Sequence, residues 1–171
     1  AKLKVGSMPA WSPDGNKIAF IAYMSEVNTN YSHNSLIVMD NAGGSKEVLF
    51  YVDKAEVHYQ DACWSPDGQF IFFTYDNNGR QVMAIHVGSK TVSNLTGKME
   101  VNGTAVENIW TSPLENKILY NIHVPGGGTL YIVDYQIGGS LISIPGNYKQ
   151  LTLDGVGHGY AEPDWQRWDG E

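Results

Sequence analysis

The pentapeptide Trp-Ser-Pro-Asp-Gly occurs twice in this 171-residue chain, at residues 11–15 and again at residues 64–68. Two weaker copies follow, "NIWTSPLENKILYNI" at 108–122 and "PDWQRWDGE" at 163–171. A self-similar period of about 40 to 50 residues, with turn signals throughout, is typical of a propeller or a solenoid. The chain is therefore expected to repeat one small structural unit.

The second copy predicts how one unit is built. It contains four short stretches rich in β-branched and aromatic residues, "DACWS", "FIFFTYD", "QVMAIHV" and "VSNLT", separated by turns such as "NNGR" and "GSKT". Such stretches joined by tight turns predict a four-stranded antiparallel meander. No helical periodicity competes with this pattern. The expected fold class is all-β, with about three propeller blades plus a terminal strand, in a partial or half propeller.

The pentapeptide itself predicts a hairpin turn. Proline presets φ for the second position of a type I turn, aspartate suits the third, and glycine suits the left-handed position that closes a bulged hairpin. The tryptophan before the turn is large enough to pack against the neighbouring sheet. In the third copy we expect Asn116 to take the left-handed position.

Taken together, these residues resemble the TolB-type, WD40-like β-propeller repeat. The resemblance is carried by the two pentapeptides, by "IVMDNAGG" and by the closing pairs Leu95-Thr96 and Leu151-Thr152. It covers about residues 7–165. It implies a periplasmic or extracellular location, because the family occurs in periplasmic, secreted and cell-surface proteins, also as a module beside peptidase domains.

The chain is expected to be a single β-propeller domain over residues 1–171. Its blades should span approximately 7–51, 60–96 and 105–152, with 160–165 as a further inner strand. Three repeats cannot easily close a ring, so we expect a fragment of a larger propeller, or a half propeller that a homodimer completes. A second copy would also cover the exposed sheet edges.

The composition excludes several classes of function. The net charge is −7, and no cluster of Lys and Arg is present that could offset phosphate charge, which argues against binding to nucleic acid or anionic membranes. No apolar run approaches the roughly 20 residues of a membrane span. The lone Cys63 excludes an intramolecular disulfide and is expected to be a buried packing residue.

The candidate ligand-binding residues lie in unusual links between the expected strands. In a propeller, the links from one blade to the next and from second to third strand share the face with the channel mouth. Four of the five histidines fall in such links, with several tyrosines beside them. The candidates are Tyr31, His33, His58, Tyr59, His123, His158 and Tyr160.

Carboxylates add to this picture. The positions three residues before each repeat tryptophan are Met8, Asp61, Glu107 and Glu162. Those positions begin the innermost strands, so the three acids are expected to ring the channel mouth. They could hold a divalent cation or line a polar groove for a peptide or a sugar. The alternative is that they are ordinary solvated loop acids.

The function that we predict is a non-catalytic propeller scaffold that binds a protein or a cell-surface component through its channel-mouth loops. No catalytic residue and no cofactor is predicted, apart from the divalent cation above. The alternative is the propeller domain of an exported enzyme. The resemblance implies either a gating domain of a serine peptidase or a polysaccharide-active enzyme with a histidine-bound metal, held by His33, His58, His123 or His158. No G-x-S-x-G motif supports a hydrolase. A structural repeat without any ligand is the third option.

Overall fold

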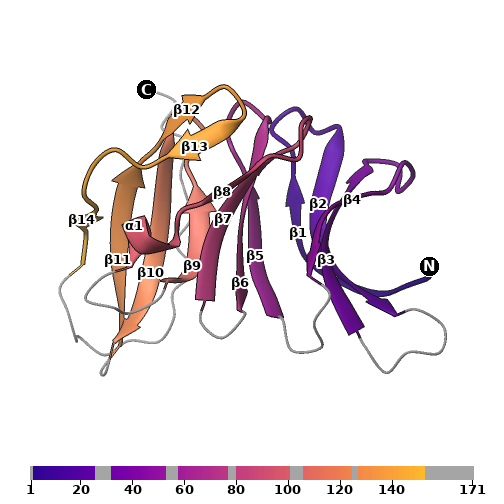
Figure 1. Ribbon diagram of the computed structural model, residues 1–171, viewed down its shortest axis with the longest axis horizontal. Helices are drawn as coiled ribbons and strands as arrows, with labels where there is room; N and C mark the ends of the chain where they lie inside the picture. Colours follow the sequence, from indigo (N-terminus) through magenta and orange to yellow (C-terminus); the bar gives the residue numbers. More distant parts are fainter. Residues whose placement is uncertain are drawn as a thin grey trace, which may run out of the picture.

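The protein is built from three four-stranded antiparallel sheets that stand side by side (Figure 1). The structure is a computed structural model, and it describes residues 2–25, 32–52, 58–76, 80–100, 106–124 and 127–152. Each sheet is one blade, and the innermost strands of successive blades contact one another. The predicted all-β class and the partial propeller of four-stranded meanders are confirmed.

The strands follow the chain within each blade. The first blade contains β1 (Lys2–Trp11), β2 (Lys17–Ser25), β3 (Ser32–Asp40) and β4 (Glu47–Val52). The second contains β5 (His58–Trp64), β6 (Phe70–Asp76), β7 (Arg80–His86) and β8 (Val92–Asn94). The third contains β9 (Val106–Thr111), β10 (Lys117–Val124), β11 (Gly127–Asp134) and β14 (Lys149–Gln150). Their order makes β1, β5 and β9 the inner strands.

Two small elements were not predicted from the sequence. A short helix, α1 (Thr96–Met99), follows β8, and a hairpin of β12 (Gln136–Gly138) and β13 (Leu141–Ser143) precedes β14. Both elements are stabilised by burial of apolar side chains in the core between the second and third blades, where Met99 and Ile142 are buried. The main chain of Ile142 also donates a 2.9 Å hydrogen bond to Ser93 Oγ in β8.

The two pentapeptides form the same hairpin turn. In the first, Ser12 Oγ donates to Asp14 Oδ1 (2.6 Å) and accepts from the main-chain N–H of Lys17 (2.9 Å). The second repeats both bonds with Ser65, Asp67 and Phe70. Gly15 and Gly68 have φ values of 71° and 69°, which side chains disfavour. The predicted turn chemistry is therefore confirmed for both copies.

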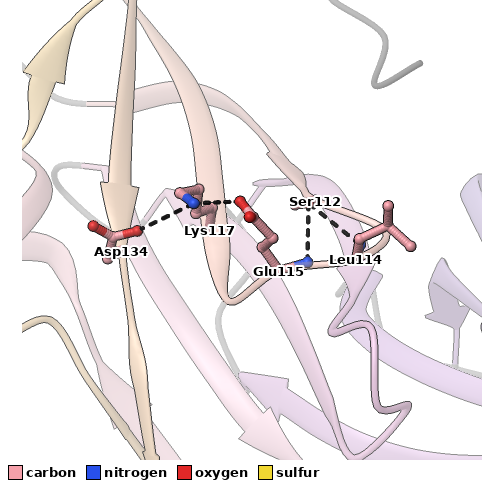
Figure 2. Close-up of polar contacts among 5 residues, drawn as sticks. All are labelled: Ser112, Leu114, Glu115, Lys117 and Asp134. Atoms are coloured by element: carbon pink, nitrogen blue, oxygen red, sulfur yellow. Dashed lines mark hydrogen bonds and ion pairs between the residues drawn. The ribbon is translucent and has the colours of Figure 1, made fainter. Parts of the chain in front are cut away.

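The third copy forms a different turn. Ser112 Oγ accepts hydrogen bonds from the main-chain N–H groups of Leu114 and Glu115, and Lys117 forms ion pairs with Glu115 and Asp134 (Figure 2). The prediction that Asn116 takes the left-handed position is wrong, because Asn116 does not have a positive φ. Ser112 Oγ is bonded to main-chain N–H groups of the turn itself. This turn therefore forms without the serine–aspartate hydrogen bond of the first two copies and without a left-handed residue at Asn116.

Alignment of the turns also changes which residue matches the repeat tryptophan. Ser12, Ser65 and Ser112 each donate their main-chain N–H across the hairpin, to the carbonyls of Lys17, Phe70 and Lys117. The residue before this serine is therefore Trp11 in the first blade, Trp64 in the second and Thr111 in the third. Trp110 lies one residue earlier. Because successive strand residues point to opposite faces, its side chain takes the other side of the sheet.

Trp64 links the first two blades. Its side chain is 6% exposed and packs with Ile21 and Val38 of the first blade, and its indole Nε1 donates to the carbonyl of Ala10 at 3.0 Å. Between the second and third blades, Thr111 Oγ1 donates to the carbonyl of Trp64 at 2.5 Å. The predicted packing of the tryptophan against the neighbouring sheet is thus observed at Trp64.

The serine–aspartate bond in the first turn should be measurable by titration. The hydroxyl of Ser12, followed by the main-chain N–H of Asn16, lowers the pKa of Asp14 to about 2. A lowered pKa means that the carboxylate stabilises the fold above its unfolded pKa of about 4 and loses this effect as the pH falls towards 2. In Ser12→Ala, an NMR titration should show the pKa of Asp14 rising towards 4. Ser65→Ala is the matched control and should leave it unchanged; an unaltered pKa in Ser12→Ala would contradict the assignment.

A buried hydroxyl yields a second prediction. Tyr135 is 2% exposed, its ring centroid lies 4.9 Å from that of Phe72, and its hydroxyl has no hydrogen-bond partner among the described residues. Burial raises its pKa well above the ordinary value. Tyr135→Phe removes a desolvated polar atom, so chemical denaturation should show an unfolding free energy that is unchanged or higher by about 1 kcal/mol. Tyr135→Leu, which loses the ring contact, should lower it by about 1 kcal/mol. A clear loss in Tyr135→Phe would show that the hydroxyl is bonded.

Candidate functional site

Each inner strand contains a β-bulge a few residues before its hairpin turn. The pairing register shifts at Met8 and Pro9 in β1, at Gln60 and Asp61 in β5, and at Glu107 in β9. A bulge places an extra residue in one strand and redirects its side chain, and bulges occur often beside binding and active sites. The residues predicted from their spacing to the tryptophans are therefore bulge residues in all three blades.

These bulges border one cavity of about 720 Å³ over the inner strands. That volume lies within the range of small-molecule and peptide sites. All three inner strands contribute to its wall, and one residue comes from the start of β7. The lining residues are Met8, Pro9, Asp61, Ala62, Cys63, Arg80, Glu107, Asn108, Ile109 and Trp110.

The bulge at Glu107 is held by a buried amide. Asn121, which is 6% exposed, accepts two hydrogen bonds at its Oδ1 atom, from the main-chain N–H of Asn108 at 2.9 Å and from Asn108 Nδ2 at 3.1 Å. The side chain thus replaces the ladder bond that the bulge interrupts. This contact fixes the main chain of β9 next to Glu107, and so fixes the position from which the Glu107 side chain extends.

One basic and one aromatic side chain join the two acids. Arg80 donates from Nη1 to the carbonyl of Val106 at 3.4 Å, which ties the start of β7 to the start of β9. The guanidinium has five N–H donors, and the bond to Val106 uses one of them. Trp110 is half-buried and adds an aromatic surface to the wall. Carboxylates and an aromatic ring together suit a cationic group, and arginine suits carbonyl or carboxylate oxygens.

The structure brings together two of the predicted site residues, Asp61 and Glu107. His33 lies in β3, His58 and Tyr59 begin β5, and His123 is near the end of β10, so the strands extend into links that were expected to be loops. The side chains of these four residues lie outside the described part of the structure. The remaining predicted residues lie outside the described residues altogether: Tyr31, His158, Tyr160 and Glu162.

Sequence reasoning missed Arg80 and Trp110. Arg80 was assigned only to the turn "NNGR", although a lone basic residue in a second-to-third strand link belongs to the channel-mouth side of a propeller. Trp110 was matched with Trp11 and Trp64. An alignment on the serine-proline pairs would have shown that it faces the opposite way.

No group of three His, Cys, Asp or Glu side chains in the described part of the chain could hold a metal ion. The predicted cation site is therefore not formed by Asp61 and Glu107 with a third described ligand of these types. No described helix is long and apolar enough to cross a membrane.

Cys63 provides a test of how dry the cavity wall is. Cys63 is half-buried in the cavity wall, where desolvation, opposed by a hydrogen bond with Thr111, raises the pKa of its thiol to about 12. Because only the thiolate is nucleophilic, its fraction at pH 8 should be roughly 1,000-fold lower than in the unfolded chain. An aromatic disulfide reagent should thus label the folded chain very slowly and label it rapidly in urea. Cys63→Ala serves as the blank, and rapid labelling of the folded chain would show that the thiol is open to water.

Comparison with known proteins supports the fold. No family model matches the chain, and no curated protein is significantly similar to it. Among solved structures, a TolB-type protein from Agrobacterium tumefaciens superposes with a TM-score of 0.65 at 18% identity, over 96% of this chain and 56% of that one. An oligogalacturonate lyase from Vibrio parahaemolyticus gives 0.57 at 15%, over 75% of this chain and 38% of that one. An acylaminoacyl peptidase from Pyrococcus horikoshii gives 0.54 at 14%, over 85% and 25%. The chain thus spans little more than half of the TolB-type structure. Its fold is that of a TolB-like β-propeller, of which the described residues form three blades.

Proposed function

We propose that this chain is a binding module that holds a segment of a protein, or of another cell-surface component, in the cavity over its inner strands. The observation that carries the proposal is the convergence of three bulged strands on one cavity lined by two acids, an arginine and a tryptophan. Polar groups that converge in a concave and partly apolar site are the usual mark of ligand recognition.

The side chains suggest what such a ligand offers. Asp61 and Glu107 would accept hydrogen bonds from a lysine or arginine side chain, whose cationic group Trp110 would stack against. Other N–H donors of Arg80 would bind main-chain carbonyl groups of an extended peptide. The preferred ligand is therefore an extended peptide with at least one basic residue. A periplasmic or extracellular location, as in the TolB-type family, is part of the same proposal.

The enzyme alternative depends on residues that the structure does not describe in side-chain detail. The structural neighbours include an oligogalacturonate lyase and an acylaminoacyl peptidase, but at 15% and 14% identity these similarities concern the fold. Propellers host unrelated functions, so the fold does not select a reaction. The histidines predicted for a metal-dependent activity remain a prediction, and no contact among the described residues favours that activity over binding.

A selection from a displayed library of random peptides tests the proposal. Peptides enriched on the chain should contain a basic residue, and calorimetry on the best synthetic peptide should give a dissociation constant that rises about 10-fold or more in Asp61→Asn and in Glu107→Gln. Glu115→Gln is the matched control, because this acid lies in the third-blade turn outside the cavity, and it should bind normally. Failure to enrich any peptide, or equal binding by all three variants, would refute the proposal.

A further inference from the structure

One residue of the cavity wall has a backbone conformation that its side chain disfavours. Met8, in the bulge of β1, has a φ of 52°. Among the described residues, the other non-glycine residues with a positive φ are Ser45 and Lys90, and both lie in links between strands, where turns commonly use such values. Within the described strands, this conformation is therefore particular to Met8.

The packing of the described blades does not account for this conformation. A left-handed backbone is unfavourable for any residue that has a Cβ atom, and glycine is the usual residue where one is needed. Met8 belongs to none of the three apolar clusters that the described residues form, so burial in a core does not offset the cost. Strained residues of this kind concentrate at binding sites, where they hold a side chain in a required place.

The equivalent positions in the other two blades are polar. Four residues before the turn serine, the first blade has Met8, the second has Asp61 and the third has Asn108. All three residues line the cavity, and neither Asp61 nor Asn108 has a positive φ. The first blade thus presents a thioether where the others present hydrogen-bonding groups, and it does so from a strained bulge.

The cavity wall is divided by polarity. The lining residues from β1 are Met8 and Pro9, which are both apolar, whereas the charged lining residues, Asp61, Arg80 and Glu107, come from the second and third blades. A methionine side chain is flexible and polarizable, so it can pack on apolar groups of different shapes. A ligand that lies across the inner strands would therefore meet carboxylates over β5 and β9 and an apolar surface over β1.

We propose that Met8 determines the specificity of this cavity by binding a large apolar side chain of the ligand, next to the basic side chain that the acids hold. The inference rests on the proposed function and narrows it to a peptide that carries both groups. Alternate residues of an extended chain point to the same side, so the apolar and basic residues should be an even number of positions apart. The strained bulge holds the Met8 thioether at the cavity.

Two substitutions at position 8 separate the backbone from the side chain. Met8→Gly removes the side chain and adopts a positive φ freely, and Met8→Asn introduces a polar group that tolerates the left-handed region. Because both relieve the strain, the midpoint of urea denaturation should be unchanged or higher. Because both lose the apolar contact, calorimetry with the best peptide from the displayed library should give a dissociation constant at least about 5-fold higher than the wild type.

Controls on both partners complete the experiment. Met8→Leu keeps an apolar side chain of similar volume, so its dissociation constant should stay within about 3-fold of the wild type. Lys90→Gly changes another residue of positive φ, outside the cavity, and should bind the peptide normally. A peptide whose apolar residue is replaced by alanine should bind the wild type at least about 5-fold more weakly, and should lose little further affinity on Met8→Gly, since contacting groups are not additive.

Failure of this inference can be told from failure of the proposed function. If no basic peptide binds, both are wrong. If basic peptides bind and Asp61→Asn weakens them, while Met8→Gly and Met8→Asn bind as the wild type does, the cavity binds peptides and Met8 does not select them. Additive losses from Met8→Gly and the alanine peptide would also overturn the inference. A clearly lower denaturation midpoint for both variants would assign Met8 to the stability of the fold instead.

Discussion

The packing of Trp64 between two sheets is the interaction on which the rest of the structure depends. A small antiparallel sheet is stable only when it buries at least one apolar face, and here each blade buries a face against the next. Trp64 fills the space between the first two blades and fixes their spacing by its 3.0 Å bond to the carbonyl of Ala10. The bond of Thr111 to the carbonyl of Trp64 continues this link to the third blade. The inner strands are held side by side as a result.

Once the inner strands are fixed, the bulges decide what faces the space between them. A regular strand alternates its side chains strictly between two faces. The face on which the two acids and Trp110 lie would then depend only on whether their positions in the strand are odd or even. The extra residues at Asp61 and Glu107 change that parity within each strand. Asn121 then holds one bulge by side-chain hydrogen bonds. The cavity is therefore formed where the strand pairing is irregular, while the regular packing of the blades holds the inner strands in place.

The sequence predicted the repeated parts of the molecule well and the unrepeated parts poorly, for a physical reason. The pentapeptide is bonded within itself, so its turn follows from a few neighbouring residues, as Ser12 and Asp14 show. The spacing to each tryptophan also located Asp61 and Glu107, because bulges recur at similar places in each inner strand. By contrast, the alignment on tryptophans matched Trp110 with Trp11 and Trp64, whereas one extra residue before Ser112 turns its side chain to the opposite face. The hairpin of β12 and β13 and helix α1 are positioned by burial of Ile142 and Met99 against residues distant in the sequence. No local sequence pattern predicts such contacts. Arg80 joins the candidate site through a hydrogen bond to Val106 in the next blade, a contact that no local pattern predicts.

The bonds of the repeat close over two very different lengths of chain, and this gives the molecule an order of assembly. Each serine clamp joins atoms five residues apart, whereas the indole of Trp64 reaches a carbonyl 54 residues away. Closing a short loop costs less conformational entropy than closing a long one. The hairpins can therefore form while the blades are still separate, and the indole contact can form only after two of them exist. The twin pentapeptide is thus a local folding unit, and its tryptophan is what makes the folding of one unit depend on another.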